Sequence, residues 1–127
     1  MNIEYCYHEE RGYLLCTPKG VVTLDDVKVY VQTLCNDNTI NAPFIEVVDF
    51  TQTKEFDFGY FEAKELIELF EALKSSKGYK GSCLVVQEDI TKSMSNLISG
   101  AGRDLGVVIK TFKTVEDACK YAEYDNT

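Results

Sequence analysis

The sequence has no tryptophan, one histidine and two prolines among its 127 residues. A lone histidine, His8, makes a metal site or imidazole-based catalysis poorly supported, because both need further ligands or a nucleophile nearby. The five cysteines are scattered, without a C-x-x-C pair, which favours free thiols in a reducing cytoplasm over a metal centre. No stretch approaches the roughly 18 apolar residues of a membrane span. We therefore expect a cytoplasmic protein without metal or cofactor.

Basic residues are also scarce, with 13 Lys and Arg against 21 Asp and Glu and a net charge of −8. Because basic residues supply most of the affinity for phosphate backbones, this balance disfavours nucleic acid as a partner. The charge is uneven along the chain: residues 44–73 are strongly acidic, whereas residues 74–113 are mostly basic. Such segments indicate either two solvated faces or complementary patches that bind a partner protein or a second copy of the chain.

Length and composition are those of one globular domain. The chain has 45% hydrophobic and 27% charged residues, and it shows no internal repeat, low-complexity tract or linker. We therefore expect a single domain over 1–127.

The pattern of apolar residues predicts alternating strands and helices. Runs rich in β-branched and aromatic residues predict strands at 2–8, 13–17, 44–49, 82–87 and 107–112. Helical spacing predicts helices over 24–35, around 63–73, 90–101 and 115–122, with Thr23 and Thr114 as caps. The order ββαβαβαβα, with a short turn at 9–12, predicts an α/β fold. Its sheet would have four or five mostly parallel strands and one antiparallel edge.

Three glycines near the last strand, Gly100, Gly102 and Gly106, have a spacing that looks at first like a phosphate-binding loop. The segment follows a predicted helix, whereas a dinucleotide-binding loop follows a strand. We interpret it as the end of a helix that turns into the last strand.

The segment from Asp49 to Tyr60 is the best candidate for a functional site. It is predicted as a loop between the carboxyl end of a central strand and a helix, and ligands or partners often bind at that edge of α/β sheets. Phenylalanines and a tyrosine crowd into it. These aromatic side chains either form an interface or fold back over the core.

The order of elements and three local patterns resemble the STAS domain, in particular the SpoIIAA-like group that includes bacterial anti-sigma-factor antagonists. Phe44 to Thr51 is similar to the family's buried strand that ends in D-[LM]-[ST]. The segment 112–118 is similar to its closing strand and last helix, and the antiparallel start of the chain is the third pattern. The resemblance covers nearly the whole chain and implies a regulatory, non-enzymatic domain.

One departure from the family concerns its phosphorylation switch. The family's D-S-S-G pattern aligns with Asp57, Phe58, Gly59 and Tyr60, so the two serine positions hold residues without a hydroxyl. The resemblance therefore implies an interaction module that lacks the phosphoserine switch. A domain that binds a small apolar, lipid-like ligand is the alternative, and an enzyme of unknown type is the third possibility. The residues predicted to bind the partner or ligand are Asp49, Thr51, Asp57, Phe58, Gly59 and Tyr60.

Overall fold

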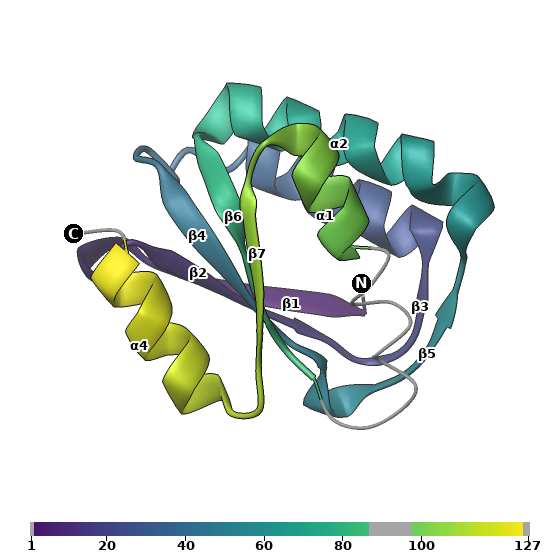
Figure 1. Cartoon of the computed structure of the whole chain (residues 1–127). Coiled ribbons are helices and arrows are strands. Elements are labelled where there is room, and N and C mark those ends of the chain that lie inside the picture. The colour runs from purple at the N-terminus through teal and green to yellow at the C-terminus, as the bar shows by residue number, and fades with distance from the viewer. Residues whose placement is uncertain (1, 87–97, 126–127) are drawn as a thin grey trace.

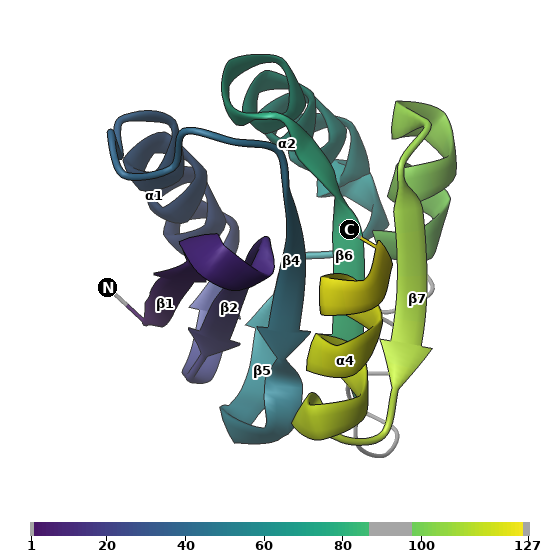
Figure 2. The same cartoon turned by 90° about the vertical axis from the view of Figure 1, so that its left-hand side faces the viewer.

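A computed structural model, which describes residues 2–86 and 98–125, shows a layered α/β domain (Figure 1). Helices α1 (Leu24–Cys35) and α2 (Ala63–Lys77) cover one face of the main sheet, together with a helical segment at 98–105. Helix α4 (Val115–Asp125) packs on the opposite face, as the rotated view in Figure 2 shows. These layers confirm the predicted fold class.

The main sheet has the strand order β1-β2-β4-β6-β7 within the described ranges. Strands β1 and β2 pair in antiparallel fashion, and β4 pairs with β2 and β6 in parallel, as β6 does with β7. The predicted hairpin and the three predicted parallel strands are therefore confirmed. The strands span Ile3–His8, Tyr13–Pro18, Phe44–Asp49, Tyr79–Val85 and Val108–Phe112.

Two short strands were missing from the sequence-based prediction. The segment 50–59, predicted as a loop, contains a 3₁₀ turn, Phe50–Gln52, and then strand β5 (Thr53–Asp57). Strand β5 pairs in parallel with β3 (Gly20–Thr23), which follows Pro18 after a single residue. The prediction of a loop was wrong because β3 offers its backbone hydrogen-bonding groups to this segment, a partner that local sequence does not show.

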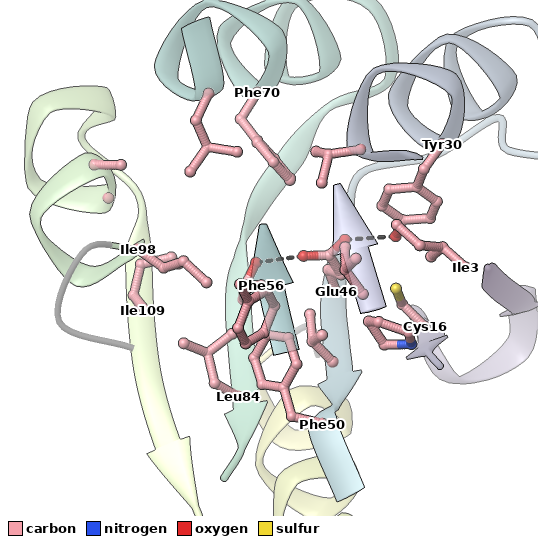
Figure 3. A pocket seen from close by; sticks show the side chains of 18 of the residues that line it. Ile3, Cys16, Tyr30, Glu46, Phe50, Phe56, Phe70, Leu84, Ile98 and Ile109 are labelled. Atoms are coloured by element: carbon pink, nitrogen blue, oxygen red, sulfur yellow. Dashed lines mark hydrogen bonds between the residues drawn. The ribbon is translucent and has the colours of Figure 1, made fainter. Parts of the chain in front are cut away.

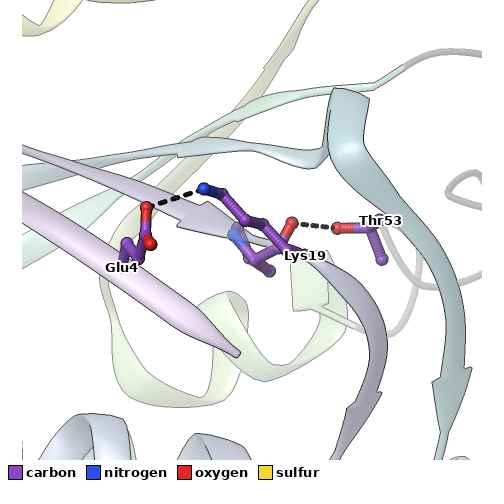
Figure 4. A network of polar contacts seen from close by, with 4 residues as sticks. Glu4, Lys19 and Thr53 are labelled. Atoms are coloured by element: carbon purple, nitrogen blue, oxygen red, sulfur yellow. Dashed lines mark hydrogen bonds and ion pairs between the residues drawn. The ribbon is translucent and has the colours of Figure 1, made fainter. Parts of the chain in front are cut away.

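Polar contacts connect the junction between β2 and β3 to its neighbours (Figure 4). The Lys19 ammonium pairs with Glu4 of β1 at 2.8 Å, and the Thr53 hydroxyl donates to the Pro18 carbonyl at 2.9 Å. The second bond connects the first residue of β5 to the last residue of β2. It therefore helps to hold the small β3–β5 sheet beside the main one.

Helix ends follow the predicted capping chemistry. The Thr23 hydroxyl accepts from the Asp26 amide at 3.1 Å, and the Asp26 carboxylate accepts from the Thr23 amide at 3.0 Å, which completes a capping box for α1. The Thr114 hydroxyl accepts from the Asp117 amide at 3.1 Å and so caps α4. These bonds satisfy amides that would otherwise lack partners at the first turns.

The predicted helix over 90–101 lies partly outside the described residues. Residues 98–105 are helical, so Gly100 and Gly102 belong to the helix instead of following it. Gly106 then takes a left-handed φ of 69°, and the amides of Gly106 and Val107 donate to the carbonyls of Arg103 and Gly102. This is a Schellman ending, which supports the interpretation of the glycines as a helix end and not a phosphate loop.

Successive side chains of β4 point to opposite faces of the sheet, and they belong to two separate core clusters. Phe44 and Val48 pack toward α1 and α2, whereas Ile45 and Val47 pack toward α4. Glu46 belongs to the first set by the period of two, and only 2% of its surface is exposed. A carboxyl group therefore lies inside the apolar layer between the sheet and the helices.

Candidate functional site

The predicted surface begins where β4 ends. The Asp49 carboxylate accepts from the Thr51 amide at 2.9 Å and caps the 3₁₀ turn that follows β4. Thr51 is exposed and Asp49 is half-buried. The structure thus brings these two predicted residues together, and their hydrogen bond orients the turn at the carboxyl edge of the sheet.

The other predicted residues lie at the end of β5. Asp57 is exposed and is the last residue of β5, six residues before α2 begins, so it does not lie at the N-terminus of that helix. The half-buried Phe58 packs edge-on against Phe56, with ring centroids 5.9 Å apart. Phe58 therefore covers the core, which is one of the two roles that the sequence left open.

Gly59 and Tyr60 form the approach to α2. The Gly59 amide donates to the Glu62 carboxylate at 2.9 Å, and the Glu62 amide donates to the Gly59 carbonyl at 3.1 Å. Tyr60 begins a 3₁₀ turn, Tyr60–Glu62, that leads into α2. The reciprocal bonds fix the backbone at the positions that correspond to the family's switch.

Phe61 lies within this turn, at the end of the predicted segment, but it was not among the six predicted site residues. Its side chain is 101% exposed, the largest exposed fraction among the exposed large hydrophobic residues described. Since transfer of an aromatic ring out of water is favourable, a fully exposed phenylalanine is a candidate anchor for a partner. It is the fifth aromatic residue within 50–61, and the sequence could not tell which of the five side chains point outward.

A second site, not predicted, lies inside the protein between the sheet and the covering helices (Figure 3). It is a cavity of about 80 Å³ with an almost wholly apolar wall. Phe70 of α2 closes one side, and the Phe50 and Phe56 rings close another. Ile98 and Ile109 line the side toward β7.

Glu46 is the charged residue that lines this cavity. Its Oε2 atom accepts from the Tyr30 hydroxyl at 2.5 Å, and its Oε1 atom accepts from the Ser82 hydroxyl at 2.7 Å. The Tyr79 hydroxyl lies 2.5 Å from that of Ser82. Because the single Ser82 proton is directed to Glu46, Tyr79 is the donor of that second bond. The Cys16 thiol also lines the cavity.

This environment favours the neutral form of the Glu46 carboxyl. Burial raises its pKa above the usual 4.5, although the hydrogen bonds from Tyr30 and Ser82 oppose the rise. Burial likewise raises the pKa of Tyr30 and of Cys16 well above their ordinary values. The network is thus a set of neutral hydroxyl and thiol groups around one carboxyl.

The geometry of β6 brings Tyr79 and Ser82 to the same face. Phe44 lies opposite Tyr79 and Glu46 opposite Ser82, so β6 contains one residue more than β4 over this stretch. Gly81, with a φ of 148°, lies within that bulge. The sequence signal that could have revealed the site is the glutamate itself, since a charged residue in a strand predicted to be buried on both faces requires partners.

The described residues contain no cluster of three His, Cys, Asp or Glu side chains that could hold a metal ion. All five cysteines are free, and Cys16 and Cys83 are buried. No helix in the described part of the chain is long and apolar enough to cross a membrane.

Comparison with known proteins places the fold. No protein-family profile and no curated protein matches this chain. Among solved structures, it is similar to an uncharacterised DUF3478-family protein with a SpoIIAA-like fold from Shewanella loihica. The TM-score is 0.62 with 18% identity, over 94% of this chain and 91% of that one. It is also similar to an anti-sigma factor antagonist from Mycobacterium paratuberculosis, with a TM-score of 0.59 and 17% identity, over 94% and 93% of the two chains. The chain therefore has a SpoIIAA-like fold, the one that its sequence patterns resemble.

Proposed function

We propose that this protein is a non-enzymatic regulatory module that binds a partner protein through the segment that runs from the end of β4 along β5 to the start of α2. The observation that carries the proposal is the fully exposed Phe61, which follows directly on the predicted site residues. The solved structure of an anti-sigma factor antagonist with the same fold supports a regulatory role.

The chemistry of this surface fits a protein interface. Phe61 supplies an apolar anchor, and Thr51 and Asp57 are exposed polar residues nearby in the chain. The outer side of α2 adds glutamates to an acidic surface. An apolar anchor within an acidic rim is expected to select a partner with a basic surface around a hydrophobic pocket.

The phosphorylated serine of the resembled family has no counterpart with a hydroxyl at the matched positions. Phe58 and Gly59 carry no hydroxyl, and Phe58 packs on the core through Phe56. We therefore propose that partner binding does not depend on phosphorylation of this segment. Mass spectrometry of the protein from its native cells would detect a phosphate on Thr51, Thr53 or Tyr60, and a phosphate there that changed partner binding would contradict the proposal.

Phe61→Ala tests the interface. The substitution should leave the melting temperature unchanged, because the Phe61 side chain is not packed against the rest of the protein. It should weaken the affinity for the partner protein by about tenfold or more, as expected for an aromatic hot spot. Tyr124→Ala, which changes another well-exposed aromatic residue near the end of α4, is the matched control. Quantitative capture of the partner protein would measure partner binding, and sedimentation velocity would measure association of the chain with a second copy of itself. Equal capture and equal self-association by the wild type and Phe61→Ala would contradict the proposal.

A small-ligand carrier is the second candidate function, and the cavity around Glu46 favours it. An apolar cavity with a few convergent polar groups is typical of a ligand site. Phe56 and Phe58, which belong to the same segment as the proposed interface, line this cavity.

A further inference from the structure

Within the part of the chain that the structure describes, no basic side chain is seen to pair with the Glu46 carboxyl. Among the described residues, none that lines the cavity is lysine, arginine or histidine. Lys19 and Lys28 form ion pairs with other, exposed carboxylates, those of Glu4 and Glu65. An ionised carboxylate in such surroundings is costly unless a cation and hydrogen bonds compensate it.

The carboxyl group has acceptor capacity to spare. A carboxylate offers about four lone-pair positions, and Tyr30 and Ser82 occupy one on each oxygen. The hydroxyl network holds the carboxyl in place through residues from α1, β4 and β6. The lone pairs of Glu46 that remain free are therefore held in a fixed orientation at the wall of the cavity, where they can accept further hydrogen bonds.

The rest of the cavity wall determines which kind of ligand fits beside Glu46. It is aliphatic and aromatic, with the Phe50, Phe56 and Phe70 rings among its members. Apolar groups of a ligand are stabilised there, and ring faces also attract cations. A volume of about 80 Å³ is roughly half that of an engineered protein cavity that binds benzene, so three or four non-hydrogen atoms fit.

We propose that this cavity binds a small alkylammonium cation, whose charged nitrogen pairs with Glu46 and whose short carbon chain packs against the apolar wall. This inference deepens the second candidate function by naming its ligand class. It does not depend on the partner surface at Phe61.

The probe is n-propylammonium chloride, which has four non-hydrogen atoms, and n-propanol is its neutral counterpart of the same size. Each is titrated to ~50 mM into the ¹⁵N-labelled full chain at constant ionic strength, because so small a ligand binds weakly. We expect saturable shifts of amide signals in β4 and β6 with the ammonium and at least tenfold weaker binding of the alcohol.

Two variants locate the site independently. Glu46→Gln retains the shape of the side chain and removes its charge, so propylammonium should bind at least tenfold more weakly. Ala101→Leu keeps Glu46 and adds three carbon atoms to the wall, since Ala101 is buried and lines the cavity, so it should abolish the shifts. The dispersion of the amide signals shows whether each variant is folded. The comparison of amine with alcohol in the wild type tests the role of charge without any variant.

Several outcomes would overturn the inference. Absence of saturable shifts, equal affinity in Glu46→Gln, or unchanged binding in Ala101→Leu would each refute the ammonium site. Propanol that binds as tightly as propylammonium would also refute it, but that result would leave the cavity as a site for neutral apolar ligands. The experiment with propanol therefore distinguishes failure of the ammonium site from failure of the proposal that the protein carries a small ligand.

Discussion

At the scale of single residues, Glu46 couples the stability of the fold to pH. Its pKa is raised in the folded protein, so the carboxyl contributes most to stability when it is protonated. That contribution is complete below its unfolded value, near 4.5, and is lost as the pH rises through the higher folded value. Binding of a cation would oppose the loss, because it would stabilise the ionised form.

Glu46→Gln should remove this part of the pH dependence. Glutamine resembles the protonated carboxyl in shape and stays neutral, so the stability of the wild type relative to the variant should fall as the pH rises from about 4.5. Urea unfolding followed by circular dichroism between pH 4 and 8 would measure it. Free-energy curves that run parallel over this range would show that Glu46 ionises as easily in the folded protein as in the unfolded one.

Asp37 provides a control of opposite sign. Hydrogen bonds from Thr39 and from the Tyr5 hydroxyl lower the pKa of its carboxyl. Its contribution to stability is therefore present above its unfolded value and is lost as the pH falls through the folded one. Asp37→Asn should flatten the acid side of the stability curve, whereas Glu46→Gln acts on the side above pH 4.5. Because Asp37 is only half-buried whereas Glu46 is buried, its effect should be the smaller of the two.

At the scale of elements, Gly81 sets the register that places Ser82 beside Glu46. Its φ of 148° lies in a region that other residues rarely adopt, and a Cβ atom there would collide with the Val108 carbonyl of the neighbouring strand. The glycine therefore permits both the bulge of β6 and the close approach of β7.

Gly81→Ala should destabilise the protein by about 3 kcal/mol or more, through backbone strain together with the collision. Two other glycines separate these causes. Gly20 has a positive φ but open space around it, so Gly20→Ala should cost about 1 kcal/mol, and Gly59→Ala, with neither constraint, should stay within about 0.5 kcal/mol. Urea unfolding of the three variants gives the comparison. A similar loss in Gly81→Ala and Gly20→Ala would show that the collision is relieved by a shift of β7.

The sequence predicted an element correctly where residues close together in the chain determine it. Helix α1 followed from its apolar spacing and the Thr23–Asp26 capping box, and the hairpin of β1 and β2 followed from two strand-like runs around a glycine turn. Strands β3 and β5 were missed because each is short and is stabilised by the other over a separation of some thirty residues. Their pairing is a property of tertiary structure.

The candidate site shows the same limit. Asp49 and Thr51 were predicted together from adjacency in the chain, and their hydrogen bond joins them. The network around Glu46 joins residues from three elements that are far apart in the sequence, so spacing alone could not reveal it. The exposure of Phe61 and the burial of Phe58 also depend on how the segment folds back, which the aromatic pattern left open.

At the scale of the whole molecule, β4 connects the two halves of the core. Its side chains alternate between the large cluster under α1 and α2 and the smaller cluster under α4. Since one strand contributes to both clusters, loss of packing on either face should weaken pairing across the sheet. We therefore expect the domain to unfold as one cooperative unit.

Leu73→Ala and Ile45→Ala test this cooperativity from opposite faces. Leu73 of α2 is fully buried in the large cluster, and Ile45 of β4 is buried against α4. Each substitution should lower the free energy of unfolding by about 2–5 kcal/mol. Native-state hydrogen exchange should then show that Leu73→Ala reduces the protection of the slowest amides in α4 as much as of those in β6. If the α4 amides kept their wild-type protection in Leu73→Ala while those of β6 lost it, the two faces would be separate unfolding units and β4 would not couple them.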